Sequence, residues 1–246
     1  MNVQDRRRIL GPQNAKPITF SSVRSETDAG SSTEDDNARL VEKDGQGSMF
    51  IKSGLVSNAN GSSYLELNGN SHYSLLVTSV YGPRPIRGSF TSQATVSVQF
   101  KEVTLERWSS GEVMEICNFL TNVFNAVIRL ERYPKSGIDI FLNLIQHSDS
   151  KKSEEDISLV SILPYCINGI TLALVDAGIE VVDMVSAGRY NRNVIAFGKN
   201  GEEIVGYWQD DNEEDILNVV QKCREEYFKG RETMVNYLVS KNSDSM

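Results

Sequence analysis

Four apolar-rich segments in the first half of the chain have the pattern of strands, and in the last of them, residues 94–100, apolar and polar residues alternate strictly with a period of two. Clusters rich in Asn, Gly and Ser separate these segments, and such clusters form turns between strands. The first half therefore predicts an antiparallel sheet. Its expected strands are residues 49–59, 62–68, 73–82 and 94–100.

Two longer segments repeat their apolar residues with the period of a helix. Residues 112–131 carry one apolar stripe that runs as far as Ile128, which predicts an amphipathic helix lying on a sheet. Residues 213–239 predict a closing helix with one buried face. The residues expected to face inward on it are Ile216, Val219, Val220, Cys223, Tyr227, Met234 and Leu238.

A third helix is predicted over residues 157–177, which are apolar on nearly all sides and should be buried. Pro164 should kink this helix or mark its start, and Gly178 should end it. Together with four further strands, the order of elements predicts the α+β class, with helices packed on mixed sheets. These strands are residues 136–146, 179–188, 193–199 and 202–208. The first of them is apolar enough to lie in the middle of a sheet. The last two should be joined by a tight turn at Asn200 and Gly201.

Polar stretches indicate the domain boundaries. Residues 21–48 and 148–156 contain too few large apolar residues to offset the entropy of ordering them. We expect an N-terminal extension over 1–48 with a flexible acidic, Ser-rich segment, one folded domain over 49–240, and a flexible tail over 241–246. No apolar run reaches the length of a membrane span, and the start lacks the apolar core of a secretory signal, so no membrane partner is expected.

The formal net charge of −8 argues against strong RNA binding by this chain alone, because neutralising phosphates needs concentrated Lys and Arg. Basic residues are nevertheless grouped locally, with Arg132 and Lys135 on either side of a Tyr-Pro pair. Arginines at strand ends suit contact with phosphates, and they equally suit salt bridges to acidic partner subunits. The sequence leaves both readings open. The candidates for RNA contact are Arg84, Arg87 and Arg107.

Motifs for catalysis are missing from the sequence. It has no Gly-rich phosphate loop before a helix and no GxSxG elbow. His72 and His147 are interpreted as exposed turn histidines rather than as bases for a nucleophile. Three distant cysteines in apolar patterns, Cys117, Cys166 and Cys223, indicate buried free thiols in a reducing compartment. We expect no catalytic residues, no cofactor and no metal site.

Carboxylates cluster between the last predicted strand and the closing helix. Paired carboxylates could hold Mg²⁺, but at this position they favour the helix dipole instead. Asp139 alternates with apolar neighbours, so we give it a structural role facing a buried polar partner. The clustered carboxylates are Asp210, Asp211, Glu213, Glu214 and Asp215.

Three segments, taken in their order and spacing, resemble the RNase PH family. They are residues 54–88, the segment YPKSGIDIFLNLIQ at 133–146, and residues 163–188, which carry the LALVDAGIEVVDMV pattern. Within the family, the chain resembles a ring subunit of the fungal RNA exosome. The positions that match the family pattern of the first segment are Gly54, Ala59, Gly61, Ser62, Glu66, Gly69, Val80, Gly82 and Pro83.

This resemblance implies the RNase PH fold, which is like the second domain of ribosomal protein S5. It implies other RNase PH-like subunits as partners in a six-membered ring, RNA in a central channel, and a cap of OB-fold and KH-type subunits. It also implies a role in the processing and decay of rRNA, snRNA, snoRNA and mRNA. The implied location is the nucleus, the nucleolus and the cytoplasm.

Departures from the family pattern bear on catalysis. Active members hold phosphate with a Gly-Gly-[Thr/Ser]-[Arg/Ser] segment just before the buried helix, but this chain has SDSKKSEEDIS there. Its consecutive carboxylates Glu154, Glu155 and Asp156 would repel phosphate. The two aspartates that active members place six residues apart are also lacking after the last hairpin, so both means of neutralising charge in phosphorolysis look lost.

The sequence therefore predicts a non-catalytic ring subunit. One alternative is an active phosphorolytic exoribonuclease, or a subunit that lends half of a shared active site. The other alternative is a stand-alone binding module of the same fold with no link to RNA.

Overall fold

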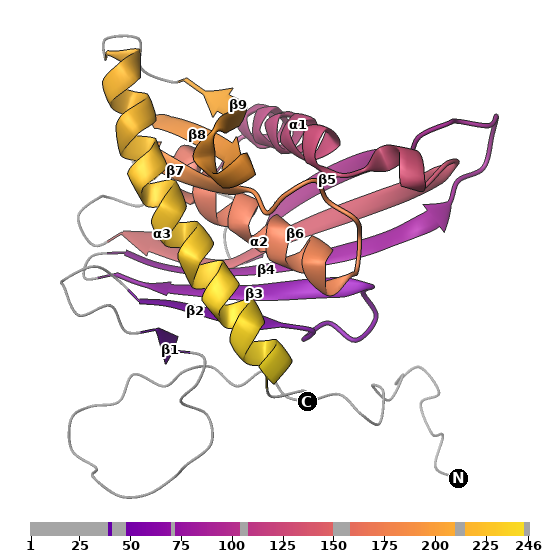
Figure 1. Cartoon of the computed structure of the whole chain (residues 1–246), viewed down its shortest axis with the longest axis horizontal. Coiled ribbons are helices and arrows are strands. Elements are labelled where there is room, and N and C mark those ends of the chain that lie inside the picture. The colour runs from indigo at the N-terminus through magenta and orange to yellow at the C-terminus, as the bar shows by residue number, and fades with distance from the viewer. Residues whose placement is uncertain are drawn as a thin grey trace, which may run out of the picture. The chain divides into compact units, whose positions relative to one another are not determined.

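The computed structural model describes residues 39–40, 48–69, 72–103, 108–149, 158–209 and 215–243. The chain divides into two units, residues 1–33 and 34–246, and every described residue belongs to the second unit. Figure 1 shows its helices and strands. The larger elements are β2 (Ser48–Ser53), β3 (Gly61–Asn68), β4 (His72–Pro85), β5 (Thr95–Glu102), α1 (Ser110–Val127), β6 (Ser136–Asp149), α2 (Leu163–Asp176), β7 (Ser186–Tyr190), β8 (Asn193–Gly198), β9 (Glu203–Trp208) and α3 (Ile216–Ser243).

A six-stranded mixed sheet forms the base of the fold, in the order β1-β2-β3-β4-β6-β5, where β1 is Arg39–Leu40. All its neighbouring strands are antiparallel except β5 and β6, which are parallel. As predicted, β6 lies inside the sheet, and Ile138, Ile140 and Leu142 are fully buried on it. An α+β fold with a mixed sheet is therefore confirmed.

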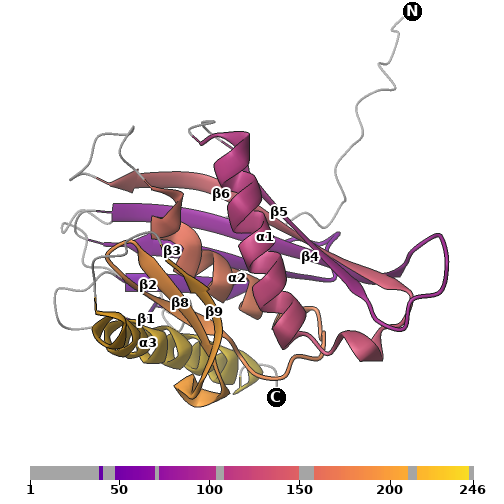
Figure 2. The ribbon, with the colours of Figure 1, turned by 90° about the horizontal axis from the view of Figure 1, so that it is seen from above.

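The helix α2 lies between this sheet and a second, three-stranded antiparallel sheet of β7, β8 and β9, as Figures 1 and 2 show. It contacts β3 and β4 on one side and β7 and β8 on the other. Its side chains are consequently buried almost all round, as the sequence predicts. Pro164 stands in the first turn, and Gly178 follows the last turn with a φ of +67°, so both predicted boundary residues are confirmed.

By length and composition alone, the window Leu159–Asp176 could cross a membrane, and it is the one such helix among the residues described. The expectation that no apolar run reaches this length is therefore wrong. The window is 78% buried inside the fold, and it combines α2 with the preceding 3-10 helix η4 (Leu159–Ile162). In this fold, the apolar side chains of α2 pack against the two sheets.

Close approach of α2 to the large sheet depends on a glycine in β3. A Cβ atom added to Gly61 would lie 2.2 Å from the Ala177 nitrogen and 2.4 Å from the Ala173 oxygen. Both neighbours are backbone atoms, so the helix and the strand would have to move apart. Gly61 thus fixes the distance between β3 and the end of α2.

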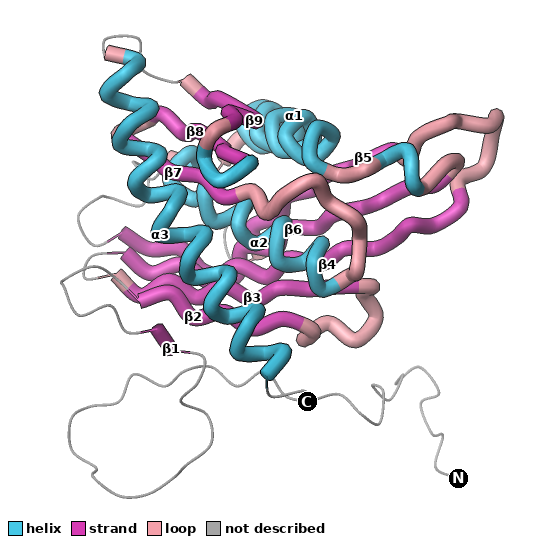
Figure 3. Tube along the Cα trace, viewed as in Figure 1, coloured by secondary structure: helices cyan, strands magenta, loops and turns pink. Residues whose placement is uncertain are grey.

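Several predicted boundaries differ from the structure. The helix α1 ends at Val127, because Ile128 is extended and forms an isolated bridge to Val181. The strand expected at 179–188 begins only at Ser186. Ile216, expected to face inward, is 52% exposed because it is the first residue of α3 and lies beyond the core. Figure 3 shows which parts of the chain are helix, strand and loop.

The ends of the folded domain also differ from the prediction. A short strand, β1, pairs Arg39 and Leu40 with β2 inside the segment expected to be flexible. At the other end, α3 continues to Ser243, so the expected tail of 241–246 begins too early. The helix extends this far because the side chain of Lys241 is held by two contacts, which we call the anchor. Its ammonium lies 2.9 Å from Asp176 Oδ1 and donates a hydrogen bond to Ser53 Oγ at 2.7 Å.

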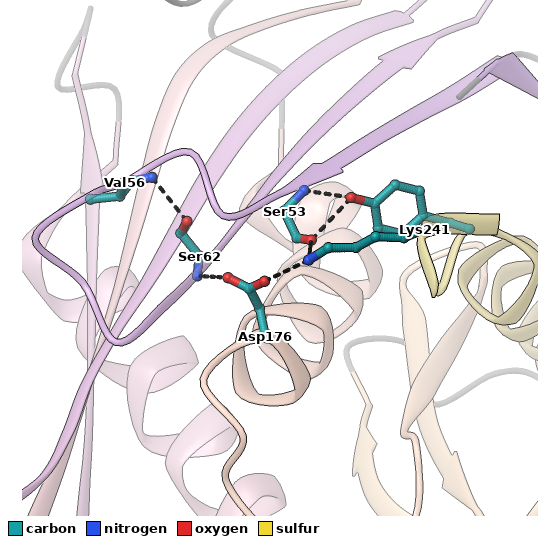
Figure 4. A network of polar contacts seen from close by, with 6 residues as sticks. Ser53, Val56, Ser62, Asp176 and Lys241 are labelled. Atoms are coloured by element: carbon teal, nitrogen blue, oxygen red, sulfur yellow. Dashed lines mark hydrogen bonds and ion pairs between the residues drawn. The ribbon is translucent and has the colours of Figure 1, made fainter. Parts of the chain in front are cut away.

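Figure 4 shows that Lys241 belongs to a network joining α3, α2 and the turn between β2 and β3. Tyr237 Oη accepts a hydrogen bond from the Ser53 nitrogen at 2.7 Å. The Asp176 carboxylate accepts from the Ser62 nitrogen at 3.0 Å, and Ser62 Oγ in turn accepts from the Val56 nitrogen. The end of α3 is thereby tied to the turn over residues 54–60.

We predict that Gly61→Ala lowers the free energy of unfolding by about 2–4 kcal/mol, because the added methyl meets backbone that cannot yield locally. Chemical denaturation measures this value. Gly111→Ala is the matched control: its added Cβ would meet only Ser109 Oγ at 3.9 Å, inside a helix that alanine favours. Equal stability of the two variants would contradict the role given to Gly61.

Truncation tests the anchor at the end of α3. Ending the chain after Ser240 removes Lys241, which should lower the free energy of unfolding by about 1 kcal/mol, because Asp176 loses its cation while keeping the Ser62 N–H. Ending the chain after Ser243 should leave stability unchanged. Thermal melts of the two truncated chains compare them directly, and identical melting would show that the ion pair contributes nothing.

Candidate nucleic-acid interface

Basic side chains gather where β4 ends and β6 begins. Register brings them together, because Arg84 lies opposite Gly137 and Pro85 lies opposite Ser136 in the antiparallel pair. The 3-10 helix η2 (Leu130–Arg132) precedes β6 and adds further cations. In Figure 1, β4, β5 and β6 run out together to this edge of the sheet. We call it the basic end, and its cations are Arg84, Arg87, Arg129, Arg132 and Lys135.

The loop 86–94, which carries Arg87, is braced at the basic end by three backbone hydrogen bonds. The nitrogen of Ile86 donates to the Lys135 oxygen at 3.2 Å, and the nitrogen of Lys135 donates to the Thr91 oxygen at 2.9 Å. At the far side of the loop, the Ala94 nitrogen donates to the Leu130 oxygen at 3.0 Å. These bonds hold the loop against η2 and the start of β6, so Arg87 is presented from a supported backbone.

Arg84 forms an ion pair with Asp139, which stands on the neighbouring strand β6. The Asp139 carboxylate is largely buried, whereas the Arg84 side chain is mostly exposed. The contact agrees with a polar partner for Asp139, but this partner is exposed and not buried as the sequence predicted. The pair neutralises part of the Arg84 charge, so Arg84 is a weaker phosphate ligand than its exposure alone would indicate.

Arg129 and Arg132 share one carboxylate. Their Nε atoms lie 3.2 Å and 3.3 Å from the two oxygens of Glu180, whose backbone nitrogen donates to Tyr133 Oη at 2.9 Å. One of these two positive charges is therefore left without an anion. Counting Glu131 as well, five cations face three carboxylates, and the basic end keeps a positive excess in a chain whose net charge is −8.

Arg87 and Lys135 make no ion pair within the described part of the chain, and both are exposed. They are the cations of the basic end best placed to meet a phosphate backbone. Two predicted candidates, Arg84 and Arg87, are thus brought together with Arg132 and Lys135, while Arg107 lies outside the described residues. Sequence reasoning did not single out Arg129, which caps η2, although its spacing of three from Arg132, the last residue of η2, places both on one side of a 3-10 helix.

The turn over residues 54–60 supports the basic end from the side. Asn60 Oδ1 accepts a hydrogen bond from the Gly82 nitrogen at 2.9 Å, and the Asn60 nitrogen donates to the Val80 oxygen. Gly82 stands two residues before Arg84. The network of Asp176 and Lys241, which fixes this turn, therefore also helps to position β4 at the basic end.

The interpretation of His147 as an exposed turn histidine is wrong. Because β6 continues as far as Asp149, His147 is buried within a strand, with Nδ1 2.6 Å from Ser74 Oγ and Nε2 3.4 Å from Ser161 Oγ. It therefore links β6 to η4. For His72, the structure describes the backbone only.

Among the described residues, the three cysteines form no disulfide: Cys166 and Cys223 are buried, as predicted, whereas Cys117 is half-buried. Burial raises the pKa of the Cys166 thiol well above its usual range. In the described part of the chain, no three His, Cys, Asp or Glu side chains are grouped as a metal site.

Asp215 Oδ1 accepts a hydrogen bond from the Leu217 nitrogen at 3.2 Å, which agrees with its predicted role at the start of the closing helix. Residues 150–157 and 210–214, with the other acidic residues singled out, lie outside the description.

Comparison with known proteins identifies the family. A model of the 3' exoribonuclease family, domain 1, matches residues 46–180. Exosome complex component MTR3 of Chaetomium thermophilum is 30% identical over 203 residues, covering 75% of this chain and 69% of that protein. Exosome complex component Rrp41 of Nitrosopumilus maritimus is 26% identical over 176 residues, covering 68% of this chain but only 62% of the relative.

Solved structures support the same fold. Rice (Oryza sativa) Rrp46 matches with a TM-score of 0.61 at 18% identity, covering 77% of this chain and 93% of that one. A chain of an archaeal exosome core matches with a TM-score of 0.56 at 12% identity. With a family model covering more than half of its residues, this chain belongs to the 3' exoribonuclease family, has the RNase PH fold, and is homologous to exosome complex components.

Proposed function

We propose that this chain is a non-catalytic subunit of an RNA exosome ring of the fungal type. In this role it joins other RNase PH-like subunits in a six-membered ring, contacts OB-fold and KH-type cap subunits, and helps to channel RNA for 3'-to-5' processing and degradation. The proposed location is the nucleus, the nucleolus and the cytoplasm. Its homology to MTR3 and Rrp41, which are named as exosome components, supports ring membership.

One observation supports the lack of catalysis. The segment between β6 and η4, where active family members hold phosphate, contains no glycine and carries Glu154, Glu155 and Asp156 in succession. A phosphate cradle needs backbone N–H groups that converge on an anion, and glycine allows the backbone this approach. Three adjacent carboxylates would instead repel the anion.

A specific observation favours a second candidate, an active phosphorolytic exoribonuclease. The matching family is described as 3' exoribonucleases, and its model covers residues 46–180, which end before β7. The two candidates differ in one measurable product, because phosphorolysis releases nucleoside diphosphates.

The proposal predicts that the chain co-purifies with RNase PH-like subunits when they are expressed together. The isolated chain, given RNA, phosphate and Mg²⁺, should release no nucleoside diphosphates, because it lacks the groups that neutralise phosphate and leaving oxygen. Chromatography of the released nucleotides is the measurement. Phosphate-dependent shortening of RNA by the chain alone would establish the second candidate, and a stable monomer that ignores the ring subunits would favour a stand-alone module.

A salt-dependence measurement tests whether the basic end contacts RNA. Within the assembled ring, Arg87→Ala should weaken binding of single-stranded RNA and reduce the slope of log affinity against log salt by about 0.7, because one phosphate contact is lost. Lys222→Ala is the control, since this lysine lies on α3 beside Glu225 and away from the basic end. Fluorescence anisotropy at several salt concentrations gives both slopes. An unchanged slope for Arg87→Ala would assign the basic end to protein contacts instead.

A further inference from the structure

A groove of about 470 Å³ lies between β5 and the first half of α1. It is at the other end of β5 from the basic end, since its β5 residues run from Val98 to Glu102 whereas Thr95 lies opposite Gly137. The groove and the basic end are therefore separate surfaces. The apolar side chains that line the groove are Val98, Phe100, Trp108, Val113, Met114 and Cys117.

The groove follows the outer edge of the large sheet. Val98 and Phe100 point to the core face of β5, while Gln99 and Lys101 point to the other face, and all four line the groove. A hollow bordered by both faces of a strand must run along its edge. Within the described residues, β5 is the last strand of the sheet and pairs with β6 alone.

Backbone direction shows which peptide groups face this edge. The Val103 nitrogen donates to the Leu144 oxygen of β6 at 2.9 Å, so the odd-numbered residues of β5 turn their peptide groups toward β6. The even-numbered residues Val98 and Phe100 consequently turn theirs outward. Val98 and Phe100 are buried, at 7% and 9% exposure, and both line the groove together with Cys117 of α1.

Charge and hydrophobicity indicate what such a groove accepts. Its lining contains one lysine, Lys101, and one glutamate, Glu102, so it has no excess charge for a phosphate backbone. Two exposed apolar side chains extend the surface at its rim, Met114 at 64% and Val103 at 53% exposure. A neutral apolar groove beside an open strand edge matches an extended peptide, which offers backbone hydrogen bonds and apolar side chains together.

We propose that this groove receives an extended apolar segment of a neighbouring RNase PH-like subunit. The segment bonds to the outward peptide groups of Val98 and places an apolar side chain against Trp108, Val113 and Met114. This inference rests on the proposed ring membership and names one surface that serves it. A groove of this size is only part of a permanent interface, which buries roughly 2,000 Å² or more, so the segment forms one element of a larger contact.

The native thiols provide a direct test. Cys117 lines the groove, whereas Cys166 and Cys223 are buried and serve as internal controls. Burial raises the pKa of the Cys117 thiol, so labelling with iodoacetamide is best done at alkaline pH, where more thiolate is present. Mass spectrometry should find Cys117 labelled about tenfold more slowly in the assembled ring than in the purified chain, as expected when an interface excludes solvent.

Two outcomes of the labelling overturn the groove proposal. Equal labelling of Cys117 in the ring and in the free chain does so while leaving ring membership intact. Protection of the free chain by an RNA oligonucleotide, without other subunits, would make the groove a nucleic-acid site. Failure of the wild-type chain to join any ring subunit is a different result, since it contradicts the proposed function itself.

A charged substitution tests the same surface without relying on the thiol. Met114→Glu places a carboxylate at the rim and should lower incorporation into the ring about tenfold, because a charge opposite an apolar segment is left unpaired. Leu217→Glu is the matched control, an aliphatic side chain that is 74% exposed near the start of α3. Thermal melting of both variants checks their folding. Wild-type incorporation of a folded Met114→Glu chain would contradict the proposal.

Discussion

Burial of one apolar helix between two sheets is the constraint on which this structure depends. The helix α2 has no polar face for water, so it is stable only where β3 and β4 cover one side and β7 and β8 cover the other. Gly61 permits the contact at its closest point, because any side chain there would enter the backbone of Ala177. The large sheet, the helix and the small sheet therefore form one stack.

Both proposed surfaces lie on the rim of this stack. At one edge, the contacts of Asp176 with Lys241 and Ser62 fix the turn before β3. Asn60 in this turn accepts a hydrogen bond from the Gly82 nitrogen, which links the turn to β4 and the basic end. At the other end of β5, the start of α1 stands beside the outer strand and creates the apolar groove. One rigid core thus positions a positively charged edge and an apolar edge, which suit different partners.

Much of the fold could be predicted from the sequence because its strong periodicities coincide with burial. The alternation in β5 and the all-round apolar character of α2 gave correct elements, and Pro164 and Gly178 gave correct boundaries. Predictions from the position of a residue along the chain were wrong where tertiary contacts determine its burial. His147 looked like a turn residue because a polar insert follows it, yet β6 extends past it and buries it against Ser74.

The candidate site, like the fold, could be predicted from the sequence only in part. Arginines at strand ends could be read from the sequence, but the partners Asp139 and Glu180 depend on strand register and on the fold of η2, which no local pattern encodes. Arg84 consequently has an ion pair that the sequence did not predict. The groove was missed altogether, because Met114 and Trp108 belong to different elements and only the packing of α1 brings them beside β5.

Loss of phosphate binding in this family member is tested most directly by soaking a crystal of the assembled ring with an anion. Sulfate mimics phosphate, and the account predicts no sulfate bound between β6 and η4 of this chain, over residues 148–158. An ordered sulfate held there by backbone N–H groups would contradict the account and restore a catalytic role.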